Sequence, residues 1–318
     1  MRIFCIFLFF SVIECVATMK VAYIADASLQ QSNSAIFNGM KSVAKELSAS
    51  HRKKIEIEFI SSNSSEEQVQ ILSKCYIGGF SAAVVYSIDD SQKLSDKISE
   101  LSEVGFLTVI LGDNLDTKNA ICRISTNAEQ RRLFVEEIIK TRSKKNTKIA
   151  CYLKRGTKSK SLSLEYDRAE IALKVKDFCS IDEFESLFKH RLLEIQCFDF
   201  YSEFAQKNAI EILRRDSYGE VFFAPELLSN MHPIARDTDR EFVLCIGALP
   251  MLEYYLASGQ ITDCIYDDFY GWGIYALRAI VEKKFTSHEI KSLRLLPPMK
   301  ASKEKYSIFV SDWQKWLK

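Results

Sequence analysis

The sequence predicts an α/β protein in which two doubly wound parallel-sheet lobes are joined by a hinge. Three observations predict this class. Short apolar runs alternate with stretches of helical spacing along most of the chain, which is the sequence form of a doubly wound sheet. The loops after the runs are rich in Ser, Asn and Asp. The alternation also occurs in two series of similar size, as expected for two domains.

The stretch 243–283 shows the alternation most clearly. Residues 243–246 are a continuous apolar run, as in a strand that is buried on both faces. A short helix with Pro250 in its first turn follows. A second apolar run, 261–266, leads through an acidic pair into a long helix that begins at Asp268.

Four strand–helix units make up the first half of the chain. Each apolar strand is followed by a polar loop and then by apolar residues at helical spacing. Ligands of doubly wound sheets bind beyond the carboxyl ends of the strands, so polar loops that recur there predict a binding site. The predicted strands are residues 20–25, 55–60, 82–86 and 106–111, and the loops after them are 26–34, 63–65, 87–90 and 112–114.

A second series of units predicts the second lobe. After a short strand at 120–124 that ends the first lobe, its strands are expected at residues 148–153, 192–198 and 220–223. We expect the helix from Asp268 to return to the first lobe, and the end of the chain to pack as a helix. The predicted division is a signal peptide at 1–17, a first lobe of 18–124 and 268–292, and a second lobe of 125–267 and 293–318, with hinge crossings between the lobes.

Residues 1–17 have the parts of a secretory signal peptide. Arg2 supplies the charge, 3–13 the apolar segment, and Cys15 and Ala17 the small residues before cleavage near Thr18. The apolar run is shorter than the roughly 20 residues that span a bilayer. The alternatives are a retained membrane anchor, a first core strand, or a lipid attached to Cys15. Glu14 disfavours the lipid attachment. We therefore predict an exported, periplasmic protein.

The charges and cysteines exclude several classes of function. The 318 residues include 43 Lys and Arg against 42 Asp and Glu, and the net charge of +1 argues against nucleic acid or an anionic membrane as the main partner. Seven of the nine cysteines follow the predicted signal peptide, so they cannot all pair. Most fall in predicted strands and resemble small core residues, while a disulfide through Cys75 or Cys179 stays open. The four histidines are far apart and no CxxC occurs, so we expect neither a zinc site nor a cofactor.

The order of elements resembles the type 1 periplasmic solute-binding proteins, the ribose- and galactose-binding family, over residues 20–300. The segment IFNGMKSVAKEL resembles the family's first helix, and VGFLTVILGDN resembles the strand that leads to a sugar-contacting acidic loop. TDCIYDDFYGWGIYALRAI resembles the segment that leads into the late helix. The resemblance implies a monomer whose two lobes close around one small polar ligand by hinge motion and then dock on a membrane partner.

The resemblance also implies the positions of the ligand contacts. Arg168 falls on the family's sugar-binding arginine, and Asp267 falls on the hinge-side contact. One departure concerns residues 247–249, which are Gly-Ala-Leu where many members have Gly-Phe-Asp, so a carboxylate that usually holds sugar hydroxyls is missing near Ala248. An altered pocket and a lost pocket both stay open. The implied or candidate ligand-binding residues are Ser28, Asn33, Phe37, Asp89, Asp113, Arg168, Glu226, Asp267 and Trp272.

These residue types fit a sugar, which presents neighbouring hydroxyls on a ring with apolar faces. Carboxylates, Asn and Arg satisfy the hydroxyls, and charge-assisted hydrogen bonds are the stronger kind. Aromatic rings cover the faces, for which Phe37, Tyr86, Phe269 and Trp272 are the candidates. Each of these aromatic residues is more often a core residue than a ligand contact. Arg168 could equally be an ordinary surface residue, and Asp267 could pair with a nearby cation.

The sequence does not support catalysis. Residues 271–276 match a dinucleotide-binding pattern, but Trp272 stands where a close approach needs a small residue, and no acidic partner follows about 20 residues later. No nucleophile elbow or phosphate loop occurs. The acidic pairs 89–90 and 267–268 could hold a cation or act as acid and base, but helix caps are commoner.

Two functions therefore remain, both of which use lobe closure around a sugar or polyol. The first is the binding component of an ABC-type uptake transporter with a membrane permease as its partner. The second is a periplasmic sensor that signals to a membrane histidine kinase or chemoreceptor. An enzyme on a similar sheet is a third reading, which predicts turnover of a candidate ligand.

Overall fold

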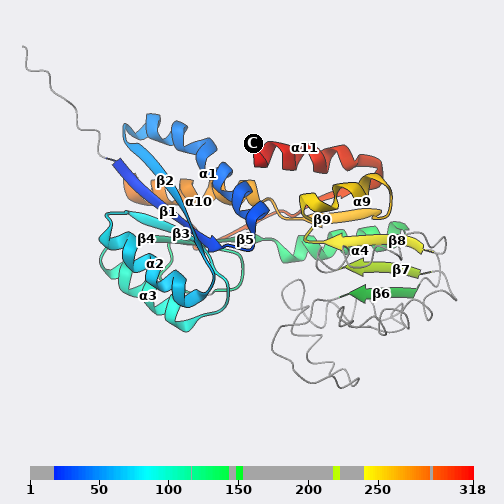
Figure 1. Ribbon diagram of the computed structural model, residues 1–318, viewed down its shortest axis with the longest axis horizontal. Coiled ribbons are helices and arrows are strands. Elements are labelled where there is room, and N and C mark those ends of the chain that lie inside the picture. The colour runs from blue at the N-terminus through cyan, green and yellow to red at the C-terminus, as the bar shows by residue number, and fades with distance from the viewer. Residues whose placement is uncertain (1–17, 116, 143–147, 153–217, 223–239, 287–288) are drawn as a thin grey trace, which may run out of the picture.

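The computed structural model describes residues 18–115, 117–142, 148–152, 218–222, 240–286 and 289–318. They form two α/β lobes, one around a six-stranded sheet and one around a five-stranded sheet (Figure 1). The predicted fold class, two doubly wound lobes joined by chain crossings, is confirmed. The predicted signal peptide, residues 1–17, lies outside the described residues.

The sheet of the first lobe is parallel throughout, in the order β10-β5-β4-β3-β1-β2. Strand β1, next to the edge strand, is flanked by β3 and β2, and its residues 21–25 are completely buried, as the apolar run predicts. The strands are β1 (Thr18–Asp26), β2 (Lys54–Ser62), β3 (Ala82–Tyr86), β4 (Leu107–Leu111), β5 (Cys122–Thr126) and β10 (Leu293–Leu296).

Two helices cover each face of this sheet. Helices α1 (Gln30–His51) and α10 (Phe269–Phe285) pack on one face, and α2 (Ser65–Ile77) and α3 (Gln92–Glu103) pack on the other. Gly273 allows α10 to approach α1, because a Cβ at this position would collide with the carbonyl oxygen of Ile36. The carboxylate of Asp268 caps α10 by accepting a hydrogen bond from the Gly271 N–H at 2.8 Å. The two glycines of the dinucleotide-like pattern therefore serve helix capping and helix packing.

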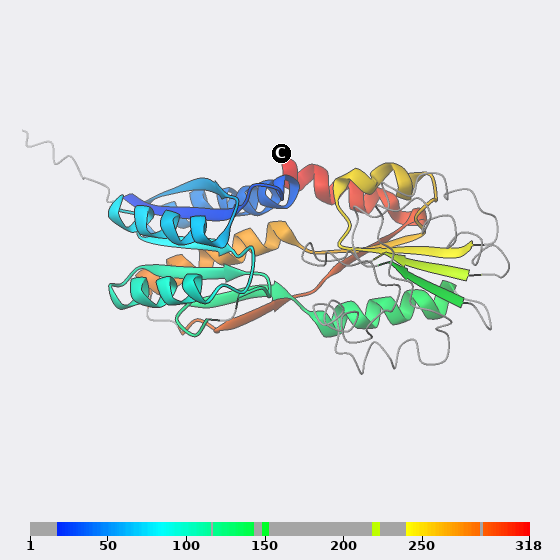
Figure 2. The ribbon, with the colours of Figure 1, turned by 60° about the horizontal axis from the view of Figure 1, so that its bottom comes forward.

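The sheet of the second lobe has the order β11-β9-β8-β7-β6, with β11 antiparallel to β9 at one edge. Helix α4 (Ala128–Arg142) lies on one face, and α9 (Glu253–Ala257) and α11 (Tyr306–Leu317) lie on the other (Figure 2). The remaining elements are β6 (Lys148–Tyr152), β7 (Tyr218–Phe222), β8 (Arg240–Ile246), β9 (Asp263–Tyr266), β11 (Met299–Ser302) and the short 3-10 turns η2 (Pro250–Leu252) and η3 (Lys303–Lys305).

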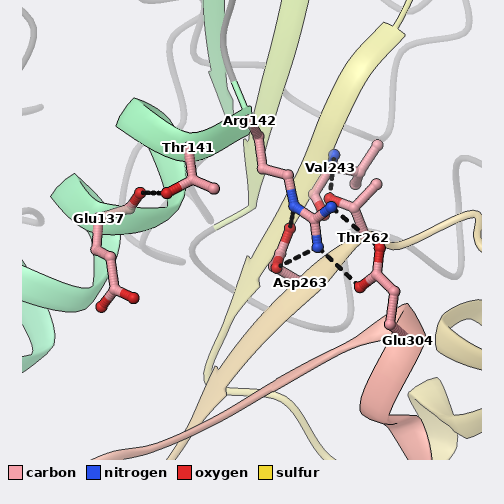
Figure 3. A network of polar contacts seen from close by, with 7 residues as sticks. All are labelled: Glu137, Thr141, Arg142, Val243, Thr262, Asp263 and Glu304. Atoms are coloured by element: carbon pink, nitrogen blue, oxygen red, sulfur yellow. Dashed lines mark hydrogen bonds and ion pairs between the residues drawn. The ribbon is translucent and has the colours of Figure 1, made fainter.

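A polar network ties three elements of the second lobe together (Figure 3). The Arg142 guanidinium, at the end of α4, donates to both carboxylate oxygens of Asp263 at 2.9 and 3.1 Å and to those of Glu304 at 3.1 and 2.9 Å. The Thr262 hydroxyl exchanges hydrogen bonds with the backbone of Val243 on the next strand. The network holds α4, β9 and η3 in place within one lobe.

Within the described residues, the chain crosses between the lobes three times, after β5, after β9 and after β10. Residues 293–296, which the sequence assigns to the second lobe, form β10 and pair with β5 in the sheet of the first lobe. The third crossing therefore follows residue 296, at Pro297 and Pro298.

Several cysteines of the described residues are core residues. Cys122, Cys245 and Cys264 are buried, which confirms this part of the prediction. Cys75, a candidate for a disulfide, is also a buried free thiol, while Cys179 lies outside the described residues. Within the described ranges, no helix combines the length and apolar character needed to cross a bilayer.

Candidate ligand site at the lobe junction

Tyr86, the last residue of β3, lies within electrostatic range of four charged side chains. Burial raises the pKa of its hydroxyl far above the usual value. The nearby carboxylates of Asp267, Asp113 and Asp26 raise this pKa further, whereas the Arg131 guanidinium lowers it. Tyr86 therefore stays uncharged at neutral pH, and its hydroxyl can both donate and accept a hydrogen bond.

An ion pair spans the first two crossings. Arg131 in the first turns of α4 donates from Nη2 to Asp267 Oδ1 at 2.8 Å, and the Thr126 hydroxyl at the end of β5 donates to the same oxygen at 2.8 Å. The side chains of Arg131 and Asp267 are only 11% and 19% exposed. No described residue is hydrogen-bonded to Asp267 Oδ2. The Thr126 bond thus joins the first lobe to this pair of the second lobe, and one carboxylate oxygen is left for another donor.

The first polar loop of the first lobe is closed by its own side chains. Asn33 is buried, donates from Nδ2 to the Asp26 carbonyl at 2.7 Å, and accepts from the Tyr23 hydroxyl at 2.9 Å. The Ser28 N–H donates to Asp26 Oδ1 at 2.8 Å, and the Ser28 side chain is exposed. Asn33 therefore shapes the loop, and the hydroxyl of Ser28 lies at its surface.

The third and fourth loops are tied to each other. Asn114 donates to the Ser87 carbonyl at 3.1 Å, and exposed Asp89 accepts from the Ser65 hydroxyl at 3.1 Å. Asp113 is exposed and follows Gly112, whose φ is +80°. A Cβ at Gly112 would lie 3.1 Å from the Tyr86 ring. Gly112 is therefore required for the turn and for the position of Tyr86.

Two of the aromatic candidates, Trp272 and Phe37, lie in different places. Trp272 packs edge-on against Tyr86 with ring centroids 5.8 Å apart and is 3% exposed, so its ring is largely enclosed by the core. Half-buried Phe37 packs against Phe59 on the edge strand β2, with centroids 6.2 Å apart. The structure thus brings Trp272 to Tyr86 and places Phe37 beside the sheet edge.

No family model matches the sequence, and no curated protein does. Solved structures match it over most of its length. The structure described as the periplasmic ribose ABC transporter from Conexibacter woesei is 16% identical, with a TM-score of 0.71, and the match covers 95% of this chain and 98% of the other. The glucose-galactose binding protein GanP from Geobacillus stearothermophilus is 14% identical, with a TM-score of 0.63 and coverage of 90% and 98%. A XylFII-LytSN complex is 14% identical, with a TM-score of 0.61 and coverage of 91% and 99%.

The chain has the type 1 periplasmic binding protein fold. This confirms the resemblance seen in the sequence, and at these identities it shows the fold alone. Within this fold, the cluster around Tyr86 lies where the carboxyl ends of the strands of the first lobe meet the crossings.

Two expected contacts of the binding-protein fold, Arg168 and Glu226, lie outside the described residues. Ala248, where the family's carboxylate is missing, is completely buried. Its N–H and that of Gly247 both donate to the Ile265 carbonyl, at 3.1 and 2.8 Å, in a tight turn at the end of β8. The side chain of Ala248 therefore packs in the core.

Arg131 and Thr126 are not among the site residues predicted from the sequence. One local signal was present for Arg131. A cation in the first turns of a helix is unfavourable because of the helix dipole, so an arginine there indicates a nearby carboxylate. The partner is 136 residues away in the sequence and is therefore invisible to local patterns. Among the described residues, no group of three or more His, Cys, Asp or Glu side chains could hold a metal ion.

Proposed function

We propose that this protein is an exported binding protein that captures a small polar ligand, a sugar, between its two lobes and delivers it to an ABC-type uptake transporter. The observation that carries the proposal is the cluster of Tyr86, Arg131 and Asp267 at the lobe junction, with Thr126 on the same carboxylate. The surroundings of a side chain at the crossings change when the lobes rotate. A ligand held by such side chains therefore favours one lobe arrangement over the other.

The chemistry of the cluster supports a hydroxyl-rich ligand. Oδ2 of Asp267 and the carboxylate of Asp113 accept hydrogen bonds from hydroxyls, and charge-assisted bonds are the stronger kind. The uncharged Tyr86 hydroxyl serves as donor or acceptor. We propose Asp89 and Ser28 as outer contacts, since both side chains are exposed on neighbouring loops. The proposed contacts also include Asn33, Phe37, Arg168, Glu226 and Trp272.

The proteins with the same fold support this choice of ligand and role. Two of those reported above are described as a ribose ABC transporter protein and a glucose-galactose binding protein. We propose the same class of ligand here, a periplasmic location after removal of residues 1–17, and no catalytic activity.

A second candidate function is a ligand sensor that signals to a membrane histidine kinase or chemoreceptor. The matching XylFII-LytSN complex pairs a protein of this fold with a second protein, which supports a partner other than a permease. Co-purification of the tagged full-length chain from its own host distinguishes the two functions, since a permease with its ATPase supports transport and a kinase or chemoreceptor supports sensing.

The ligand is tested by a thermal-shift screen of sugars and polyols on purified residues 18–318. A ligand at a hundredfold excess over its Kd adds about 2.7 kcal/mol to the apparent stability. We expect at least one sugar to raise Tm, and we expect Asp267→Asn to reduce the shift while the matched variant of an exposed residue, Asp90→Asn, keeps it. A panel without any shift contradicts the sugar proposal, and consumption of a shifting sugar, followed by NMR, contradicts the absence of catalysis.

A further inference from the structure

The C-terminal helix α11 is anchored in the second lobe (Figure 1). Phe309 on α11 packs edge-on against Tyr266 of β9, with ring centroids 5.1 Å apart. The Tyr266 hydroxyl donates to Asp312 on the next turn of α11 at 2.8 Å. Both contacts join α11 to the sheet of the second lobe, so a movement of this lobe carries the helix with it.

The opposite end of α11 contacts the first lobe. Asn38 of α1 donates from Nδ2 to the backbone carbonyl of Trp316 at 2.9 Å. The ring of Trp313 lies 6.1 Å from that of Phe269, the first residue of α10. The Lys315 ammonium lies 5.7 Å from the centroid of the Tyr270 ring. Helix α11 of the second lobe therefore packs against α1 of the first lobe (Figure 2) and reaches the start of α10 through Trp313 and Lys315.

A series of aromatic rings leads from α11 to the candidate ligand site. Trp316 and Trp313 are 4.9 Å apart, Phe269 and Trp272 are 5.2 Å apart, and Trp272 and Tyr86 are 5.8 Å apart, all measured between ring centroids. Trp313, Trp316, Phe269 and Trp272 are all buried. Close-packed side chains cannot move independently, so a shift of α11 displaces the rings next to Tyr86.

We propose that α11 is a strap that restrains the two lobes against each other and couples its own position to the ligand site. When the second lobe rotates about the crossings, α11 must slide along α1 or lose its contacts with Asn38 and Phe269. The strap therefore favours the described lobe arrangement before any ligand binds. This inference deepens the proposed function. It rests on that function, because it requires the lobes to move during ligand capture.

The test measures the distance between the lobes in the absence of ligand. Spin labels are attached through non-natural amino acids at two exposed positions, Lys93 in the first lobe and Ala257 in the second. Thiol-reactive labels are avoided because they would also react with the protein's own cysteines. We expect a narrow distance distribution for the otherwise unchanged protein. We expect Asn38→Ala to shift the ratio of the lobe arrangements about two- to tenfold, as for the loss of one neutral hydrogen bond. Trp316→Ala should shift it further.

The matched control is Gln314→Ala on the exposed face of α11, which should keep the distribution unchanged. An unchanged distribution in Asn38→Ala overturns the strap, and this variant decides the question if Trp316→Ala fails to fold. Equal broadening in Gln314→Ala also overturns it, since the effect would then be a general loosening of the helix. The spin labels measure the lobe distance without ligand, so the two proposals can fail separately. If no sugar gives a thermal shift but Asn38→Ala broadens the distance distribution, the proposed ligand is rejected and the strap proposal is retained.

Discussion

Helix α4 carries an arginine–aspartate pair at each end, and in both pairs the aspartate comes from the region of β9. Arg142 at the end of α4 contacts Asp263 at 2.9 Å, and Arg131 near its start contacts Asp267 at 2.8 Å. The first pair lies within one lobe, engages both oxygens of the carboxylate and recruits Glu304. The second pair shares a single oxygen with Thr126 of the other lobe. Similar chemistry thus stabilises one lobe at one end of α4 and links the two lobes at the other.

The largest expected effect on stability and binding comes from replacing Asp263 and Asp267, one at a time, with alanine. Asp263→Ala leaves Arg142 with only the exposed Glu304, and removal of one partner from a pair with a buried carboxylate lowers the free energy of unfolding by about 3 kcal/mol. Asp267→Ala should also lower stability, because it removes the carboxylate from largely buried Arg131, but unlike Asp263→Ala it should abolish most of the sugar affinity. Urea denaturation and binding titration measure the two quantities. If Asp267→Ala lowers stability as much as Asp263→Ala and leaves affinity unchanged, both pairs are structural.

The next prediction uses two glycines with the same backbone conformation. Gly112 and Gly79 have φ of +80° and +77°, so an alanine at either position costs about 1–2 kcal/mol. A Cβ at Gly112 also presses on the Tyr86 ring, whereas a Cβ at Gly79 meets no atom within 4 Å. We expect similar losses of stability by thermal melting, but a loss of ligand affinity only in Gly112→Ala. Equal affinities in the two variants would mean that the position of Tyr86 does not matter for binding.

Arginine-to-lysine changes at the two ends of α4 give a smaller effect. Arg142→Lys loses a guanidinium that contacts four carboxylate oxygens, so we expect a loss of about 1 kcal/mol in unfolding free energy. Lysine can replace the bond from Arg131 to one oxygen of Asp267, so Arg131→Lys should change stability less than Arg142→Lys. The comparison is contradicted if Arg131→Lys is the more destabilising change in denaturant melts.

The smallest effect is the pH dependence of the Arg142 network. Hydrogen bonds from Arg142 lower the pKa of Glu304 from its usual 4.5 to about 2. Since the folded pKa is the lower one, Glu304 contributes stability above pH 4.5, and this contribution is lost as the pH falls towards 2. Glu304 is half-exposed, which keeps the contribution small. Glu304→Gln should flatten the decline of Tm between these pH values, and an equally steep decline would show that the pair contributes nothing.

The local patterns of the sequence predicted most strands and the lobe architecture because these depend on apolar periodicity. The run at 243–246 lies within β8, and the acidic residue before the late helix, Asp268, is its N-cap. The pairing of β10 with β5 could not be predicted, since its four residues resemble any short apolar run. The same holds for Arg131, whose partner is set by the tertiary fold. Trp272 shows what could not be predicted for aromatic residues, because sequence spacing alone does not distinguish a ring in the core from a ring that contacts a ligand.

The central claim is that the lobes change their arrangement around a sugar held at the Arg131–Asp267 junction. Small-angle X-ray scattering on residues 18–318, with and without the sugar that gives the largest thermal shift, tests it most directly. The account predicts that this sugar changes the radius of gyration of the unaltered protein and that Asp267→Asn loses the change at the same sugar concentration. An unchanged radius of gyration under saturating sugar, or a full change in Asp267→Asn, would contradict it.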